Sequence, residues 1–198
     1  MSSDNILTQI EFLIEIDKLK RILRQTWLVD NSRQENSAEH TWHAALSALV
    51  LSEYANDPDL DLLRVVKMLL IHDLVEIDAG DTFLYSDHLD SEKYKAEQRA
   101  AKRIFGLLPT EQGESLLELW EEFEVMSTPE AKFAKAIDAL QPVLMAYGNE
   151  GASWKKHNLK KADILERKDT IQLGSERLWI LTQELLDNAS ERGYFGPE

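Results

Sequence analysis

The sequence predicts an all-α protein folded as a single-domain helical bundle. Apolar residues recur at three- and four-residue steps along most of the chain, which is the period of an amphipathic helix. No run rich in valine and isoleucine alternates with polar residues in the manner of a strand. The 198 residues contain no linker of domain-separating length, and one compact domain is the expectation at this size.

Two helices are expected in the first sixty residues. The first covers residues 6–23, because apolar residues form one stripe there while charged residues take the opposite face. Residues 27–34 show no period and are expected to form a loop. The second helix begins at a cap provided by Asn36 or Ser37 and ends at the Asn-Asp-Pro stop over residues 56–58.

Three further helices follow. One begins near residue 59 and ends over residues 77–80, because Gly80 can adopt the left-handed conformation common at helix ends. A charged helix is expected over residues 90–105. Another opens at Pro109 and Thr110 and continues through residue 123.

The last third of the chain has a strong helix start. Residues 127–130 read Ser-Thr-Pro-Glu, which combines a hydroxyl cap, an early proline and an acidic residue. We expect Pro142 to kink the helix that begins there and residues 148–151 to end it. A final long helix is expected over residues 161–188.

Composition limits the function classes. There are 22 basic and 36 acidic residues, so the formal net charge is −14, which excludes a protein that coats nucleic acid with a broad basic surface. A small anionic ligand remains compatible, because a local cation can reverse the field of one pocket. The chain has no cysteine, so thiolate metal sites and cysteine nucleophiles are excluded. No membrane span or leader pattern is apparent, and a cytoplasmic protein without a membrane partner is expected.

Four side chains are candidates for a metal site. His72 and Asp73 follow a strongly apolar run, and Asp138 stands alone in an apolar helix interior. His40 lies in the first turn of its expected helix. A buried carboxylate requires compensation, and a mixed set of imidazoles and carboxylates suits a divalent ion.

Each candidate also has a structural explanation. His72 and Asp73 could form a surface or supporting pair, and Asp138 could be paired with a lysine or arginine on a neighbouring helix. His40 could bond to the nearby backbone at its helix start. The single residues therefore leave the alternatives open.

Three segments together resemble the HD-domain metal-dependent phosphohydrolases. Residues 33–40 read RQENSAEH and are similar to the R-x-E-x-x-x-[E/D]-H signature of the group related to bacterial 5′-deoxyribonucleotidases. Residues 72–81 read HDLVEIDAGD and match the H-D-x-x-E-x-x-x-G-D block of that group. Residues 135–140 read KAIDAL and resemble its K-x-x-D-x-[L/C] segment. The resemblance spans about residues 18–145, the expected motif-bearing core of a single domain over residues 1–198, and leaves a C-terminal helical extension at about 152–198.

The resemblance implies a role for each of these motif residues. It assigns His40, His72, Asp73 and Asp138 as ligands of a divalent metal ion (Co, Mn, Fe, Mg or Zn). Glu76 lies four residues after His72 and three after Asp73, so all three are neighbours on the expected helix face. The resemblance makes Glu76 the general acid/base and has Asp81 orient water or substrate.

The resemblance also bears on the number of metal ions and on the residues that bind the substrate. His88 is the only histidine between Asp73 and Asp138, whereas two-metal HD proteins use additional histidines there, so a mononuclear site is expected. Arg33 is the first candidate for the phosphate, since its planar fork can hold two oxygens. Arg24 is the second.

In these deoxyribonucleotidases an aromatic ring beside the corresponding arginine helps to reject the ribose 2′-hydroxyl. Here Gln25 follows Arg24, and the nearest ring is Trp27. We retain Trp27 as a candidate substrate-binding residue.

The function that the resemblance implies is a phosphomonoesterase. It would hydrolyse deoxyribonucleoside 5′-monophosphates to nucleoside and phosphate, as a homodimer. One alternative is another nucleotide phosphohydrolase of the HD type, and a second is a non-catalytic sensor that binds metal and nucleotide. Longer phosphate chains would need basic residues besides Arg33 and Arg24, and the sequence displays no such cluster.

Overall fold

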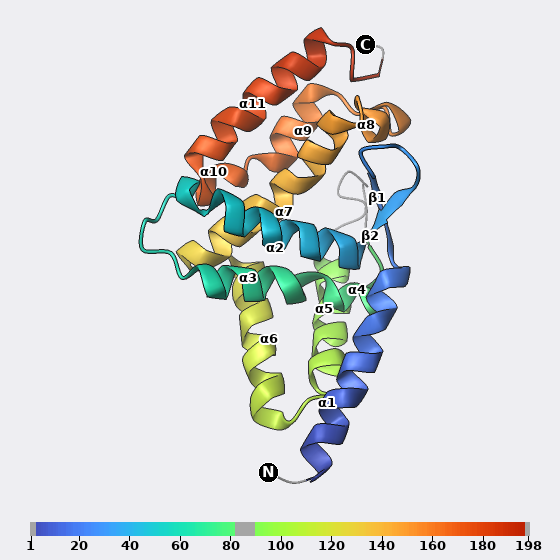
Figure 1. Cartoon of the computed structure of the whole chain (residues 1–198), viewed down its shortest axis with the longest axis vertical. Coiled ribbons are helices and arrows are strands. Elements are labelled where there is room, and N and C mark those ends of the chain that lie inside the picture. Colours follow the sequence, from blue (N-terminus) through green and yellow to red (C-terminus); the bar gives the residue numbers. More distant parts are fainter. Residues whose placement is uncertain (1–2, 82–89, 197–198) are drawn as a thin grey trace.

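The computed structural model describes residues 3–81 and 90–196. These residues form helices joined by short connections, together with one two-stranded sheet (Figure 1). The expected all-α fold is therefore confirmed. Within the described residues, no helix combines the length and the apolar character needed to cross a membrane.

The elements in chain order are α1 (Ser3–Glu15), the 3-10 helix η1 (Ile16–Arg21), β1 (Leu23–Trp27), β2 (Gln34–Asn36), α2 (Ser37–Leu51), η2 (Ser52–Tyr54), α3 (Leu62–Ile71), η3 (His72–Val75), α4 (Glu76–Ala79), α5 (Asp90–Phe105), α6 (Thr110–Val125), α7 (Pro129–Gly148), α8 (Ala152–Lys156), α9 (Lys161–Lys168), α10 (Ile171–Gly174) and α11 (Glu176–Glu191).

A short hairpin replaces part of the first expected helix and the loop after it. The chain leaves α1 through η1 and enters β1, which pairs antiparallel with β2. Leu23 lies opposite Asn36, and Trp27 lies opposite Gln34. Asn31, at a φ of 58°, supplies the left-handed residue that asparagine tolerates in turns. Strands of five and three residues are too short to show a two-residue period.

The expected helix over residues 59–80 consists of three segments. The α-helix α3 ends at Ile71, the 3-10 turn η3 begins at His72, and α4 ends at Ala79 with Gly80 as its C-cap. Gly80 has a φ of 75°, which confirms its predicted role as the left-handed terminus. The change of helix type brings His72 and Asp73 to the end of α3.

The expected final helix is wrong as a single element. Residues 161–188 fall into α9, α10 and part of α11. The break between α10 and α11 lies at Gly174, where a Cβ atom would lie 2.3 Å from the carbonyl oxygen of Lys132. Only glycine allows this approach to α7, after which Ser175 accepts a hydrogen bond from the Leu178 amide and caps α11.

Two apolar clusters hold the fold together. The larger contains buried residues from α2, α3, α5, α6 and the first half of α7. The smaller, which we name the C-terminal cluster, comprises Val143, Ala146, Trp154, Leu159, Ile164, Leu186, Ala189 and Tyr194. The helix α7 continues through Pro142 and contributes to both, as its central position in Figure 1 illustrates.

Candidate active site

A cavity of about 390 Å³ is lined by residues of both apolar clusters. Its volume falls in the range of small-molecule sites. The charged and polar side chains in its lining are Arg24, Gln25, Thr26, His72, Asp73, Glu76, Asp81, Lys93, Glu97, Glu124, Lys135, Asp138, Ser153, His157, Arg167, Lys168 and Thr170. These residues come from both ends of the sequence, so the complete fold is needed to form the cavity.

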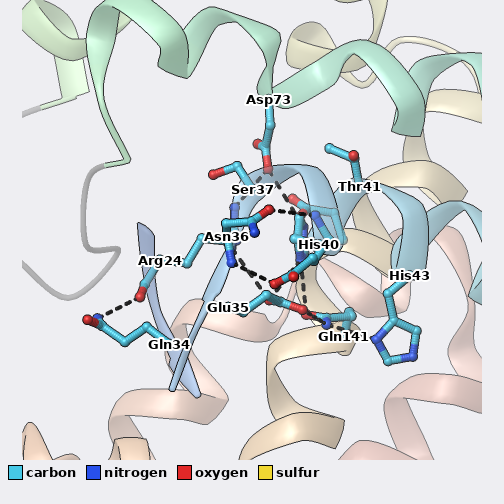
Figure 2. A network of polar contacts seen from close by, with 12 residues as sticks. Arg24, Gln34, Glu35, Asn36, Ser37, His40, Thr41, His43, Asp73 and Gln141 are labelled. Carbon is cyan, nitrogen blue, oxygen red and sulfur yellow. Dashed lines mark hydrogen bonds and ion pairs between the residues drawn. The ribbon is translucent and has the colours of Figure 1, made fainter. Parts of the chain in front are cut away.

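The start of α2 positions His40. The Asn36 side chain accepts from the Glu39 amide, and the Glu39 carboxylate accepts from the Asn36 amide, forming a capping box. The first turn of α2 is thereby fixed, and His40 is fully buried. Its Nδ1 donates to Gln141 Oε1 at 3.0 Å (Figure 2). The Nε2 atom lies 2.9 Å from Asp138 Oδ1.

The junction of α3 and η3 positions His72. Its Nδ1 donates to the carbonyl oxygen of Leu69 at 2.8 Å, which leaves Nε2 to face the cavity. This buried Nε2 makes no hydrogen bond within the described part of the chain. Asp73 Oδ1 lies 3.1 Å away and Asp138 Oδ1 lies 3.5 Å away. An unsatisfied ring nitrogen between two carboxylates is suited to bind a cation.

The four candidate metal ligands therefore lie together. One ligand atom each from His40, His72 and Asp73 falls within 4.8 Å of the others, and Asp138 contacts both imidazoles. Both rings donate through Nδ1, so both present Nε2 to the same point. The residues fit a divalent ion with nitrogen and oxygen ligands. His88, which bears on the number of ions, lies outside the described residues.

The acidic and imidazole groups shift one another's protonation. Burial alone would raise the pKa of Asp138, but the hydrogen bond from His40 and the nearby His72 imidazole hold this pKa well below its usual range. Burial favours the neutral imidazoles, yet the neighbouring carboxylates raise the pKa of His40 and of His72. The cluster thus attracts positive charge, as protons or as a metal ion.

Arg24 lies beside this cluster. The hairpin places its guanidinium against Asp73, where Nη1 donates to Oδ2 at 2.8 Å. Glu76 Oε1 is 3.8 Å from Nη1, and Glu35 Oε2 is 3.9 Å from Nε. Figure 2 shows Asp73 reaching the start of α2 from a separate segment. Arg24 lines the cavity and is a cation available at the metal cluster.

Glu76 and Asp81 also line the cavity. Glu76 is buried and accepts a hydrogen bond from Ser37 Oγ at 2.5 Å. Burial and the nearby Asp73 raise the pKa of Glu76 to about 9. Asp81 follows the turn at Gly80, as the sequence predicts, and is partly exposed. Both carboxyl groups are thus available at the cavity.

Arg33 and Trp27 are not brought to the cavity. Arg33 is exposed on the hairpin and forms a bidentate ion pair with Glu39, at 2.6 and 2.8 Å. Neither residue belongs to the cavity lining, where Gln25 and Thr26 follow Arg24 instead. The departure at position 25 seen in the sequence is therefore also a departure in the cavity wall, where Gln25 takes the place beside Arg24.

Sequence reasoning missed several residues of the site. Gln141 is buried and links His40 to Glu35 and His43, donating to Glu35 Oε1 at 2.8 Å. Its polar side chain, one turn after Asp138 in a mostly apolar helix, was a signal in the sequence that Gln141 belongs to the site. Lys168 gave no such signal, since it lies in a charged segment without a motif.

Comparisons with known proteins agree with this geometry. The HD domain family matches residues 16–179. The chain belongs to the HD domain family. Human 5′-deoxynucleotidase HDDC2 is 33% identical over 173 residues, covering 84% of this chain and 83% of the human protein. The fission yeast 5′-deoxynucleotidase hdd1 is 29% identical and covers 76% of each chain.

One solved structure is more similar in sequence than these relatives. The crystal structure of a predicted metal-dependent phosphohydrolase from Magnetospirillum magnetotacticum is 47% identical, with a TM-score of 0.92, over 98% of this chain and 96% of that one. A conserved hypothetical protein from Pyrococcus furiosus is 26% identical, with a TM-score of 0.65. The HD domain match extends beyond residue 145 into α11, so most of the C-terminal helices belong to the matched region.

Proposed function

We propose that this HD domain protein is a metal-dependent phosphohydrolase that converts deoxyribonucleoside 5′-monophosphates to nucleoside and phosphate. The observation that carries the proposal is the convergence of two imidazoles and two carboxylates at a cavity of nucleotide-compatible size. The relatives named 5′-deoxynucleotidases support the substrate class.

We assign the divalent ion to His40, His72, Asp73 and Asp138. The support is chemical, because both Nε2 atoms are oriented by a second hydrogen bond and the Nε2 of His72 is buried without one of its own. When bound, such an ion polarises phosphoryl oxygens and activates water at neutral pH. Cobalt, manganese, iron, magnesium and zinc all accept this ligand set.

Glu76 would transfer the proton of the reaction. Its carboxyl group lies in the cavity and is held by Ser37 Oγ, beside but outside the ligand set. From there it can take a proton from the attacking water or give one to the leaving 5′ oxygen. Asp81 would orient water or substrate from the turn after Gly80.

Arg24 would bind the phosphate. It is the candidate arginine that lines the cavity, and its guanidinium is anchored by Asp73, so the fork is held in one orientation. Gln25 and Thr26 lie where they can contact the sugar. Roles for Arg33 and Trp27 in substrate binding stay predictions that would require a rearranged hairpin.

We further propose that the protein is cytoplasmic and acts as a homodimer, and an exposed apolar face on α2 supports the dimer. Trp42, Leu46, Leu49 and Val50 are 62%, 43%, 50% and 65% exposed on α2. Their spacing places them on one helix face, and a second copy is the simplest cover for such a face.

The test begins with elemental analysis of the purified protein. Phosphate release is then measured across ribo- and deoxyribonucleoside monophosphates with several divalent ions. We expect release from deoxyribonucleotides that depends on the ion and is abolished by chelation. Stoichiometric nucleotide binding without any product would instead indicate the non-catalytic sensor and overturn the proposal.

A further inference from the structure

Basic side chains of the cavity are mostly neutralised by the protein itself. Lys135 Nζ lies 2.9 Å from Glu124 Oε1, and Lys93 Nζ lies 3.5 Å from Glu97 Oε1. Arg24 is paired with Asp73. These cations balance acidic residues of the wall and leave little net positive charge for a dianionic phosphate.

Lys168 differs from these cations. It is 8% exposed and lines the cavity from the last turn of α9. No ion pair or hydrogen bond within the described residues engages its Nζ, so the ammonium group neither caps the carbonyl groups of α9 nor is neutralised by a carboxylate. An ammonium group in a largely dehydrated position without a counter-charge is costly, and an anionic ligand in the cavity would offset that cost.

Lys168 lines the same cavity as Asp138 and Arg24, which belong to the proposed reaction centre. Burial lowers the pKa of Lys168 to about 8, and the charges of Asp138 and Arg24 also act on its ammonium group. At neutral pH the group therefore still carries its proton. Arg167, the preceding residue, is exposed at the cavity wall and has no carboxylate partner in the described part of the chain.

We propose that Lys168 is a phosphate-binding residue, which completes from α9 the anion site that Arg24 begins from β1. The inference deepens the proposed function and rests on it for the identity of the substrate. Arg167 adds positive charge at the cavity wall. The C-terminal helices thereby contribute directly to substrate recognition, although they carry no motif.

The experiment compares metal-loaded wild-type protein with Lys168→Met, Lys168→Arg and the charge-matched control Lys67→Met, because Lys67 is exposed on α3 away from this cavity. Calorimetric titration with inorganic phosphate measures binding without turnover. Loss of one charge-assisted contact should weaken phosphate binding and raise KM by about tenfold or more in Lys168→Met. Lys168→Arg should recover part of the affinity, and metal content should be unchanged.

A second readout separates binding from packing. Lys168→Met removes a largely dehydrated charge that has no ion-pair partner among the described residues, so the phosphate-free variant should melt at a higher temperature than wild type. Added phosphate should then stabilise it less than it stabilises wild type. Equal phosphate affinity in Lys168→Met and wild type would overturn the inference.

The outcomes distinguish the two proposals. If no nucleotide is hydrolysed but phosphate binding requires Lys168, the proposed function fails and the anion site stands. If deoxyribonucleotides are hydrolysed and Lys168→Met has an unchanged KM, the function stands and the role of Lys168 is refuted.

Discussion

His72 illustrates how one residue depends on its backbone. It is the first residue of η3 and keeps helical backbone angles, and its Nδ1 donates back to the Leu69 carbonyl group. That hydrogen bond fixes the ring and directs Nε2 toward Asp73 and Asp138. The ligand geometry is thus set before an ion arrives, which reduces the entropy lost on binding.

Glu76 can be tested as a proton-transfer residue at the same scale. Glu76→Gln keeps the volume and the contact with Ser37 but cannot exchange a proton, so kcat should fall by at least about a hundredfold. Metal content, measured by elemental analysis, should remain that of the wild type. Glu114→Gln, an exposed change on α6, serves as the control. Loss of the ion in Glu76→Gln would show that Glu76 is a ligand.

The sequence was informative about residues whose type is unusual for their surroundings. Asp138 in an apolar helix, and His72 with Asp73 after an apolar run, both indicated a metal site. The structure brings these residues together with His40. Arg33 and Lys168 show the limit. A surface arginine and a buried lysine look alike in a sequence, because only the fold decides which cation lies in the cavity.

At the scale of elements, the capping box of α2 connects the hairpin to the active site. Asn36 ends β2 and caps α2, so a single residue belongs to the strand and to the helix start. The start of α2 was predictable because caps are local in sequence. The hairpin was not, since its strands are short and its pairing joins residues on either side of a loop.

We expect Asn36→Ala to destabilise the protein by about 1 kcal/mol, because the Glu39 amide loses its acceptor. Asn36→Asp retains a side-chain oxygen and should stay close to wild type. Urea unfolding measures both. Equal stability of Asn36→Ala and wild type would mean that the cap contributes nothing.

The C-terminal cluster offers a test of backbone geometry. Gly151 has a φ of 76°, and a Cβ atom there would lie 1.9 Å from the carbonyl oxygen of Tyr194. Gly193 has a similar φ of 69° with nothing within 4 Å. Gly193→Ala should therefore cost about 1–2 kcal/mol from backbone strain alone.

Gly151→Ala should cost clearly more than Gly193→Ala, because collision is added to the same strain. The free energy of unfolding of each variant provides the comparison. Matching losses for the two would show that Tyr194 moves aside freely.

At the scale of the whole molecule, the exposed apolar face of α2 allows the proposed dimer to be tested by mutation. Replacing both Leu46 and Leu49 with glutamate should convert a dimer to a monomer, since two charges cannot be buried unpaired in an interface. Leu181→Glu on α11, also an exposed leucine, is the control. Sedimentation velocity measures the mass of the protein particle in solution, and a monomeric wild-type protein would contradict the proposal.

The general fold was predictable because helical periodicity is strong over most of the chain. The breaks in the last expected helix were not, since Gly174 is required by an approach to α7 that residues 161–188 alone do not reveal. The division between a motif-bearing core and a C-terminal extension remains a proposal about organisation. The cavity draws residues from both parts.

The continuity of α7 has a practical consequence. Asp138 and Ala146 lie on one uninterrupted helix, about 12 Å apart at 1.5 Å per residue. A truncation directly after the last motif, residues 135–140, would cut α7, the helix that carries Asp138. Minimised versions should therefore leave the C-terminal helices in place.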